Sequence, residues 1–170
     1  MQVVIDSVTL KHVVRQPRVT SKSKRSSPTH ENPLHEPIRL RKIKLALDAA
    51  RGLISEWEKT CGPDIKVLVA YWGEHDGILL IQNPPSPGAV ISKRLKILGF
   101  GNDTIDKLVL RIALGTVDRI IVSDDSDFWD PKRPNDRKLI GNPNAPVSRL
   151  CREELKVTIL LFQMLLSKLK

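Results

Sequence analysis

Segments with helical spacing alternate with segments that read as strands along this 170-residue chain. In residues 53–61 and 104–115 the apolar positions recur every three to four residues, as they do on one face of a helix. Alternation of this kind predicts a single α/β domain over residues 1–170, in which a central, mostly parallel sheet lies between two layers of helices, a three-layer α/β/α fold. The predicted strands are residues 2–6, 42–47 before a turn at 48–52, 65–72, 118–125 and 155–161. Residues 77–85 are a further strand or a short buried segment that ends at prolines, and the other predicted helices are residues 91–100 and 162–170.

The segment IIVSDDSDFWDP, residues 120–131, runs from a buried strand directly into a group of aspartates. In parallel α/β sheets, ligands bind beyond the carboxyl ends of the strands. Asp6 ends the first predicted strand, and Asp124 and Asp125 end the strand at 118–125. We therefore expect these carboxylates to meet at one edge of the sheet.

Asp106 is a further carboxylate for this edge. At 100° per residue it falls on the apolar flank of its helix, whereas Asp103, Lys107 and Arg111 share a polar side. A carboxylate on an apolar flank costs free energy unless it has a partner, and gathered like charges destabilise a fold. A divalent cation would relieve the repulsion, and Mg²⁺ and Mn²⁺ prefer hard oxygen ligands.

Two local explanations of the same residues stay open. Asp103 and Asp106 are also suited to capping the first turn of their helix. The DDSD cluster, residues 124–127, is also suited to a turn held by an Asx-type hydrogen bond.

The chain is strongly basic, with a formal charge of +9 and an isoelectric point near 9.8. Such an excess favours a polyanionic partner, usually nucleic acid. Residues 15–38 are basic, rich in Ser, Pro, Thr and Asn, and without an apolar period, which predicts a long, mobile loop. A solvated surface loop and a segment that orders on an acidic protein are the alternatives. The predicted nucleic-acid-binding residues are Arg15, Arg18, Lys22, Lys24 and Arg25, and Lys93, Arg94 and Lys96 form an alternative basic face.

The rest of the composition bears on location. No apolar run approaches the roughly 18 to 20 residues of a membrane span, so we expect a soluble protein with no membrane partner. The first ten residues carry Asp6 and lack a basic lead, which does not fit a signal peptide. Cys61 and Cys151 have no metal-ligand spacing, which indicates reduced thiols and a cytoplasmic protein.

Two segments resemble PIN-domain nucleases. The segment DTIDKLVLRIALGTVDRIIVSDDSDF, residues 103–128, resembles the stretch in which a helix-borne Asp precedes a strand that ends in a (T/S)-x-D-x-D-F turn. The segment MQVVIDSVTL, residues 1–10, resembles the opening strand of that family with its first metal-binding Asp. The resemblance implies a PIN-like fold and a metal-dependent nuclease, above all an endoribonuclease, that hydrolyses phosphodiester bonds with Mg²⁺ or Mn²⁺.

The resemblance also implies a set of site residues. LALDAARGLISEWEKT, residues 45–60, looks like the part of the family that carries an early acid. Periodicity does not separate Glu56 from Glu58, and the resemblance selects Glu56. Two adjacent aspartates leave open which of Asp124 and Asp125 binds metal, and Asp127 either supports the site or forms the turn. The implied catalytic residues are Asp6, Glu56, Asp106 and Asp125, and the implied metal ligands are these four with Asp124 and Asp127.

Other function classes compete with a nuclease. One is a nucleic-acid-binding module with a PIN-like fold and no turnover. Another is a nucleotide-sugar or phosphotransfer enzyme that holds metal with the DDSD cluster, although no Gly-rich phosphate loop accompanies that cluster. RNA is the expected substrate ahead of DNA. The family includes toxin-like ribonucleases that partner proteins silence, and processing or decay nucleases, so an inhibitory or regulatory partner fits the resemblance. The oligomeric state stays open, and a homodimer is one of the alternatives.

If the basic segment contacts a phosphate backbone, replacing its five predicted binding residues by Ala should weaken RNA binding at low salt. The plot of log K against log[salt] should flatten by up to about 0.7 for each lost single-strand phosphate contact. An Asp125→Asn background keeps the RNA intact during the salt titration. Equal affinities and parallel slopes would show that this segment does not contact nucleic acid.

Overall fold

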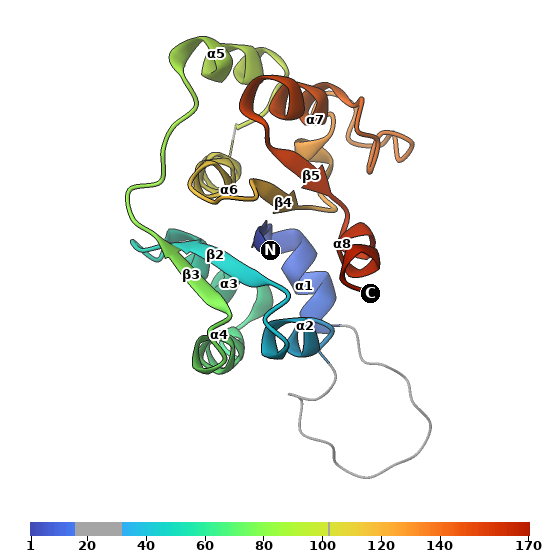
Figure 1. Ribbon diagram of the computed structural model, residues 1–170. Helices are drawn as coiled ribbons and strands as arrows, with labels where there is room; N and C mark the ends of the chain where they lie inside the picture. The colour runs from blue at the N-terminus through green and yellow to red at the C-terminus, as the bar shows by residue number, and fades with distance from the viewer. Residues whose placement is uncertain (16–31, 102) are drawn as a thin grey trace.

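The computed structural model describes residues 1–15, 32–101 and 103–170 and contains a five-stranded, all-parallel sheet (Figure 1). The strands lie in the order β3-β2-β1-β4-β5, with β1 at the centre. This confirms the predicted α/β class and the parallel sheet. The strands are β1 (Gln2–Ile5), β2 (Lys44–Asp48), β3 (Ile78–Ile81), β4 (Ile120–Val122) and β5 (Thr158–Leu160).

Helices cover both faces of the sheet, which gives the three-layer arrangement predicted from the sequence (Figure 1). One face carries α1 (Ser7–Arg15), α2 (His35–Arg39), α3 (Gly52–Cys61), α4 (Ile65–Glu74) and α8 (Phe162–Leu169). The other face carries α6 (Thr104–Leu114) and α7 (Pro146–Leu150), with α5 (Ala89–Ile97) lying outside them. A 3₁₀ turn at Ser126–Phe128 follows β4, and a π-helical turn at Cys151–Leu155 continues α7.

The central strand explains why this sheet forms. Val3, Val4 and Ile5 of β1 are fully buried, as are Leu45, Ala46 and Leu47 of β2. A strand covered by helices on both faces needs apolar side chains at successive positions, which is the pattern of parallel sheets. The core therefore lies on both sides of β1, and the polar residues that follow the strands are left at the carboxyl edge.

The prediction of a strand at residues 65–72 was wrong, because these residues form most of α4. Ile65 and Trp72 are buried, with Leu68 and Val69 partly buried between them, which is helical spacing. Val67 is 63% exposed, as expected on the outer face of a helix. The β-branched composition suggested a strand, but the three-to-four-residue period determined the structure.

Three other segments differ from the sequence prediction. Residues 7–15 form α1, and residues 146–155 are helical, although neither helix was predicted. The predicted loop at 15–38 is also wrong where it is described, since α2 begins at His35 and both Leu34 and Ile38 are fully buried. The short apolar set of Leu34 and Ile38 is enough to anchor this turn of helix to the core.

Within the part of the chain that the structure describes, no helix is both long enough and apolar enough to cross a membrane.

A pair of glycines tests the assignment of α4. A Cβ added at Gly77 would lie 2.8 Å from the carbonyl oxygen of Trp72 and would also overlap the side chain of Ile38. A Cβ at Gly73, inside α4, would meet nothing within 4 Å. Gly77→Ala should therefore lower the free energy of unfolding by about 1 to 3 kcal/mol. Gly73→Ala should leave it unchanged or raise it by up to about 1 kcal/mol, because Ala favours a helix over Gly.

Urea denaturation of both variants checks this prediction. Equal destabilisation by the two substitutions would contradict the helix at residues 65–74 and the close approach of Gly77 to α2.

Candidate functional site

The carboxyl ends of β1 and β4 lie next to each other at the centre of the sheet. Ile5 pairs with Val122, and the backbone N–H of Asp6 donates to the carbonyl oxygen of Val122 at 3.0 Å. From β1 the strand order runs through β2 to β3 on one side and through β4 to β5 on the other. This reversal is the position at which open α/β sheets bind ligands. The predicted acidic edge therefore has a defined location.

Asp6 lies at the end of β1 and also begins α1. Its Oδ2 accepts hydrogen bonds from the backbone N–H and the Oγ1 of Thr9, both at 3.4 Å, in the manner of a helix N-cap. The residue is 2% exposed. Burial raises the pKa of Asp6 to about 6, and the negative charge of Asp125 adds to this effect. Asp6 thus interacts electrostatically with the turn after β4.

The turn after β4 directs its two adjacent aspartates to different places. The Oδ1 of Asp125 accepts from the backbone N–H of Asp127 at 3.1 Å, and the Oγ of Ser123 donates to Asp6 at 3.4 Å. The carboxylate of Asp124 instead accepts from the backbone N–H of Phe162, at the start of α8. Of the two candidates, Asp125 acts on Asp6, whereas Asp124 joins the turn to α8.

Asp106 is the acid that local structure explains least. It is 8% exposed in the first turn of α6, and its carboxylate accepts no hydrogen bond and forms no ion pair with any described residue. The pKa of Asp106 is raised to about 8. Burial is the main cause, and the negative charges of Asp127, Asp6, Asp103 and Asp125 raise this pKa further. The helix flank predicted from the periodicity of residues 104–115 is confirmed, since Asp106 is buried together with Val109, Leu110 and Ala113.

Asp103 and Asp127 complete the group of interacting acids. Burial raises the pKa of Asp127, and the charges of Asp125 and Asp103 raise it further. Asp103 is the N-cap of α6, where its side chain accepts from the backbone N–H of Ile105 at 2.8 Å. Sequence reasoning placed Asp103 on the polar side of its helix and did not include it in the site. Its position three residues before Asp106, one helical turn away, is the signal that would have included it.

The acid cluster is defined as Asp6, Asp103, Asp106, Asp125 and Asp127. Capping accounts for three members, because Asp6, Asp103 and Asp125 each accept a backbone N–H at the start of the helical turn that follows. The local explanations of Asp103 and of the DDSD turn are therefore supported. Capping does not account for Asp106, whose side chain caps nothing among the described residues.

Glu56 is not brought to the acid cluster. Its carboxylate accepts from the Oγ1 of Thr60 at 3.0 Å and lies 3.7 Å from the Nζ of Lys59, both on its own helix. It is not among the charges that raise the pKa of Asp6 or of Asp106. Glu58, the other candidate, forms an ion pair with Lys66 of α4 at 3.2 Å. The early acid thus remains a prediction from the resemblance.

Asp48 ends β2 beside this edge and has a structural role. Its two carboxylate oxygens accept from the backbone N–H groups of Gly52 and Leu53, at 2.8 and 2.9 Å, and so hold the start of α3. A carboxylate with both oxygens engaged in this way stabilises the helix N-terminus.

Two buried tryptophans hold the strand ends that carry the acids. The Nε1 of Trp57 donates to the carbonyl oxygen of Ile5 at 3.3 Å, and the Nε1 of Trp129 donates to that of Ser123 at 3.2 Å. Trp129 is 1% exposed and is therefore not available to stack on a nucleic-acid base. Both rings are packing elements that fix the backbone next to Asp6 and Asp125.

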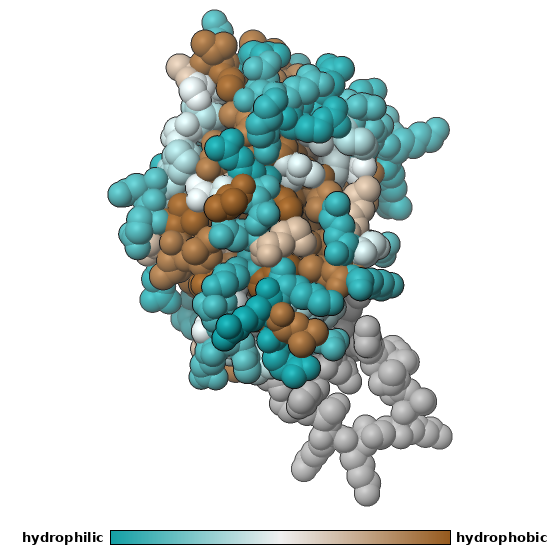
Figure 2. Space-filling view, in the orientation of Figure 1, coloured by the Kyte–Doolittle hydropathy of each residue, from teal (hydrophilic) through white to brown (hydrophobic). Residues whose placement is uncertain are grey.

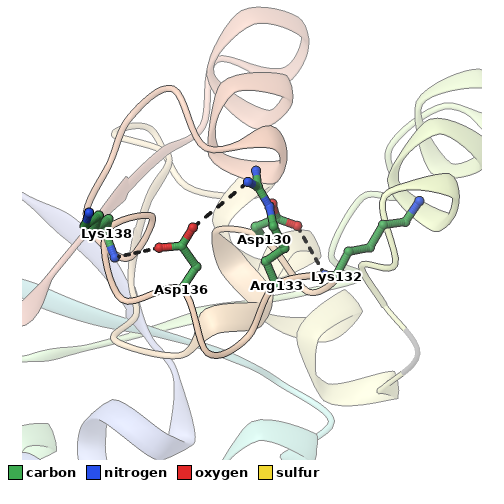
Figure 3. A network of polar contacts seen from close by, with 5 residues as sticks. All are labelled: Asp130, Lys132, Arg133, Asp136 and Lys138. Carbon is green, nitrogen blue, oxygen red and sulfur yellow. Dashed lines mark hydrogen bonds and ion pairs between the residues drawn. The ribbon is translucent and has the colours of Figure 1, made fainter.

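The loop after the acidic turn is held by contacts of the carboxylates of Asp130 and Asp136 with Arg133 and with backbone N–H groups (Figure 3). The carboxylate of buried Asp130 accepts from the Nε of Arg133 at 2.9 Å and from the backbone N–H of Lys132 at 3.2 Å. Asp136 lies 4.0 Å from Arg133 and accepts from the backbone N–H of Lys138 at 3.2 Å. Asp130 therefore stabilises this loop and does not belong to the acid cluster.

The acid cluster offers only oxygen donors, which suits Mg²⁺ or Mn²⁺. As the side chains stand, no three acidic, imidazole or thiol groups among the described residues share the geometry of a metal site. Mg²⁺ is commonly held by one or two carboxylates, with waters and substrate phosphates in the remaining positions. The donor set fits that kind of binding and does not form an all-protein cage.

Comparisons with protein-family models, with curated proteins and with solved structures gave no match. The resemblance to PIN-domain nucleases therefore rests on the motifs in residues 1–10, 45–60 and 103–128.

Of the predicted nucleic-acid-binding residues, Arg18, Lys22, Lys24 and Arg25 lie outside the described residues, and Arg15 is the last residue of α1.

The raised pKa of Asp106 predicts a pH dependence of stability. Because the folded pKa, about 8, exceeds the ordinary value of 3.8, the proton on Asp106 stabilises the fold fully below pH 4. That stabilisation is lost as the pH rises toward 8. In metal-free buffer Asp106→Asn, which cannot ionise, should therefore be more stable than wild type at pH 8, by on the order of 1 kcal/mol, and not at pH 4.

Urea unfolding of wild type and Asp106→Asn across this pH range gives the measurement. Asp103→Asn is the matched control, since Asn caps a helix as well as Asp does. If the free energies of unfolding of Asp106→Asn and wild type change with pH in parallel, ionisation of Asp106 does not destabilise the fold, and the prediction is wrong.

Proposed function

We propose that this protein is a metal-dependent nuclease that hydrolyses phosphodiester bonds, most of all in RNA. The single observation that supports this function is Asp106, a buried carboxylate without a hydrogen bond or ion pair from the described residues, surrounded by the charges of four other aspartates. Groups with strongly shifted pKa values gathered at a ligand-binding edge are typical of functional sites. The position of the cluster, at the strand-order reversal, adds to this support.

In the proposed site Asp6, Asp106 and Asp125 hold the cation, and Asp127 lies next to them. Mg²⁺ or Mn²⁺ would neutralise charge on the attacked phosphate and lower the pKa of an attacking water. The caps that Asp6 and Asp125 form fix the directions of their carboxylates before any ligand arrives. Asp106 belongs to α6, which covers the face of the sheet opposite to α1 (Figure 1). The substrate phosphate would therefore lie between β1, β4 and α6.

The net charge of +9 supports a polyanionic substrate. RNA comes ahead of DNA on the resemblance alone. The same resemblance is the basis for proposing a regulatory protein partner. The two cysteines, whose spacing is not that of metal ligands, are the basis for proposing a cytoplasmic location.

A non-catalytic nucleic-acid-binding module is the second candidate. The observation in its favour is that no three acids share metal-site geometry in the described residues. A binding module, however, gains nothing from a buried and repulsive acid cluster, because like charge at the site weakens the binding of phosphate.

The neighbouring aspartates of the turn provide a matched test. Asp125→Asn keeps the side-chain shape and removes a charge from the cluster, so cleavage of labelled single-stranded RNA in Mn²⁺ should fall by about two orders of magnitude or more. Asp124→Asn removes a charge one residue away, and its amide oxygen can still accept from Phe162. It should therefore cleave at close to the wild-type rate.

Cleavage is measured in Mn²⁺, in Mg²⁺ and in EDTA, with single-stranded DNA as a second substrate. Wild-type turnover in EDTA, or equal rates for the two Asn variants, would contradict the assigned site. No cleavage of either nucleic acid by wild type in any metal would favour the binding module.

A further inference from the structure

A pocket of about 530 Å³ lies between α5 and α6, outside the acid cluster. Leu95, Phe100 and Leu110, each 3% exposed or less, give it an apolar floor. Lys93, Lys96 and Lys107 form its rim. Its volume lies within the range of roughly 300 to 1,000 Å³ that is usual for small-ligand sites. In the space-filling view of the same orientation, hydrophobic and hydrophilic side chains lie together over α5 at the top of the molecule (Figure 2).

The cations that line this pocket form no ion pairs with the described residues. The three rim lysines are exposed, and none forms an ion pair with a described carboxylate, although Arg94, beside Lys93, pairs with Glu154. A fourth cation, Arg111, is fixed at the wall, because its Nε and Nη2 donate to the carbonyl oxygen of Pro84 at 3.1 and 2.7 Å. A concave site lined by positive charges raises the local concentration of anions.

The pocket and the acid cluster share a wall. The ring of Phe100 packs edge to face on Phe128, with ring centres 5.4 Å apart, and Phe128 directly follows Asp127. On α6, exposed Lys107 directly follows Asp106, and buried Leu110 lies one turn after Asp106 on the apolar flank. The pocket and the acid cluster thus both draw residues from α6 and are linked by the contact of Phe100 with Phe128.

We propose that this pocket binds one nucleotide of a single-stranded nucleic acid, with its phosphate on the lysine rim and its base against the apolar floor. The adjoining phosphodiester bond then lies at the acid cluster. A single strand is required, because a base held in a duplex is stacked and paired and cannot enter a pocket, whereas an unstacked base can. This inference rests on the proposed function, since it names the form of substrate that the same site receives.

The test measures binding separately from cleavage. Wild type and a Lys93→Ala/Lys96→Ala/Lys107→Ala variant are titrated with a fluorescein-labelled oligouridylate in EDTA, at several salt concentrations. A variant with Lys66, Lys138 and Lys168 changed to Ala is the control, because it removes the same charge from exposed positions outside the pocket. Thermal unfolding of all three proteins checks that the exposed substitutions leave the fold intact.

The pocket variant should bind the oligouridylate about tenfold or more weakly at low salt, and its salt slope should flatten by up to about 2, from three lost phosphate contacts. The control variant should change far less. Inorganic polyphosphate and polyglutamate are the competitors, and both should displace the oligouridylate less well at equal charge, because neither offers a base to the floor.

Equal losses in the pocket and control variants would overturn the inference, since the effect would then be one of net charge. Polyphosphate that competes as well as the oligouridylate would show a phosphate site without a base. Polyglutamate that does so would show a surface for an acidic protein, and either result overturns the proposal.

The failures of the two proposals are distinguishable. If wild type cleaves RNA while the pocket variant binds and cleaves as wild type does, the pocket proposal fails and the nuclease stands. If the pocket variant loses binding but wild type never cleaves, the pocket stands and the nuclease fails.

Discussion

The parallel pairing of β1 with β4 is the interaction on which the rest of the site depends. These two strands are far apart in the sequence, and their register sets Asp6 beside Ser123, with the backbone N–H of Asp6 bonded to Val122. Because β1 is buried on both faces, a shift of register would carry apolar side chains out of the core on two sides. The hydrophobic core thus fixes which polar residues share the carboxyl edge.

In the proposed site, helix capping and cation binding would use the same aspartates. Asp6, Asp103 and Asp125 each stabilise the start of a helix or turn, and that role directs their carboxylates toward a common place. Asp106 gains no such stabilisation from the described residues, and it lies among charges of its own sign. The free energy that this arrangement costs without a cation is the physical basis of the proposed metal site.

The sequence was sufficient for the features that depend on short patterns. Apolar runs predicted β1, β2, β4 and β5 near their observed positions and gave β3 as a strand or a short buried segment. The period of residues 104–115 placed Asp106 on the buried flank. It was not sufficient where two patterns overlap, as in residues 65–72, whose β-branched residues form a helix. Nor could spacing separate Asp124 from Asp125, because the direction of Asp124 depends on its contact with Phe162, which is distant in the sequence. The pocket between α5 and α6 depends on how two helices pack, which no local pattern contains.

Direct binding of Mn²⁺, followed by the electron paramagnetic resonance signal of the free ion, tests the central claim that the acid cluster is a cation site. The protein should remove Mn²⁺ from solution at a saturable site, with Asp106→Asn binding at least about tenfold more weakly, as expected when a charged ligand is lost. Asp124→Asn should bind as wild type does. Equal Mn²⁺ affinities for wild type and Asp106→Asn, or a larger loss in Asp124→Asn, would contradict the assignment of the cluster.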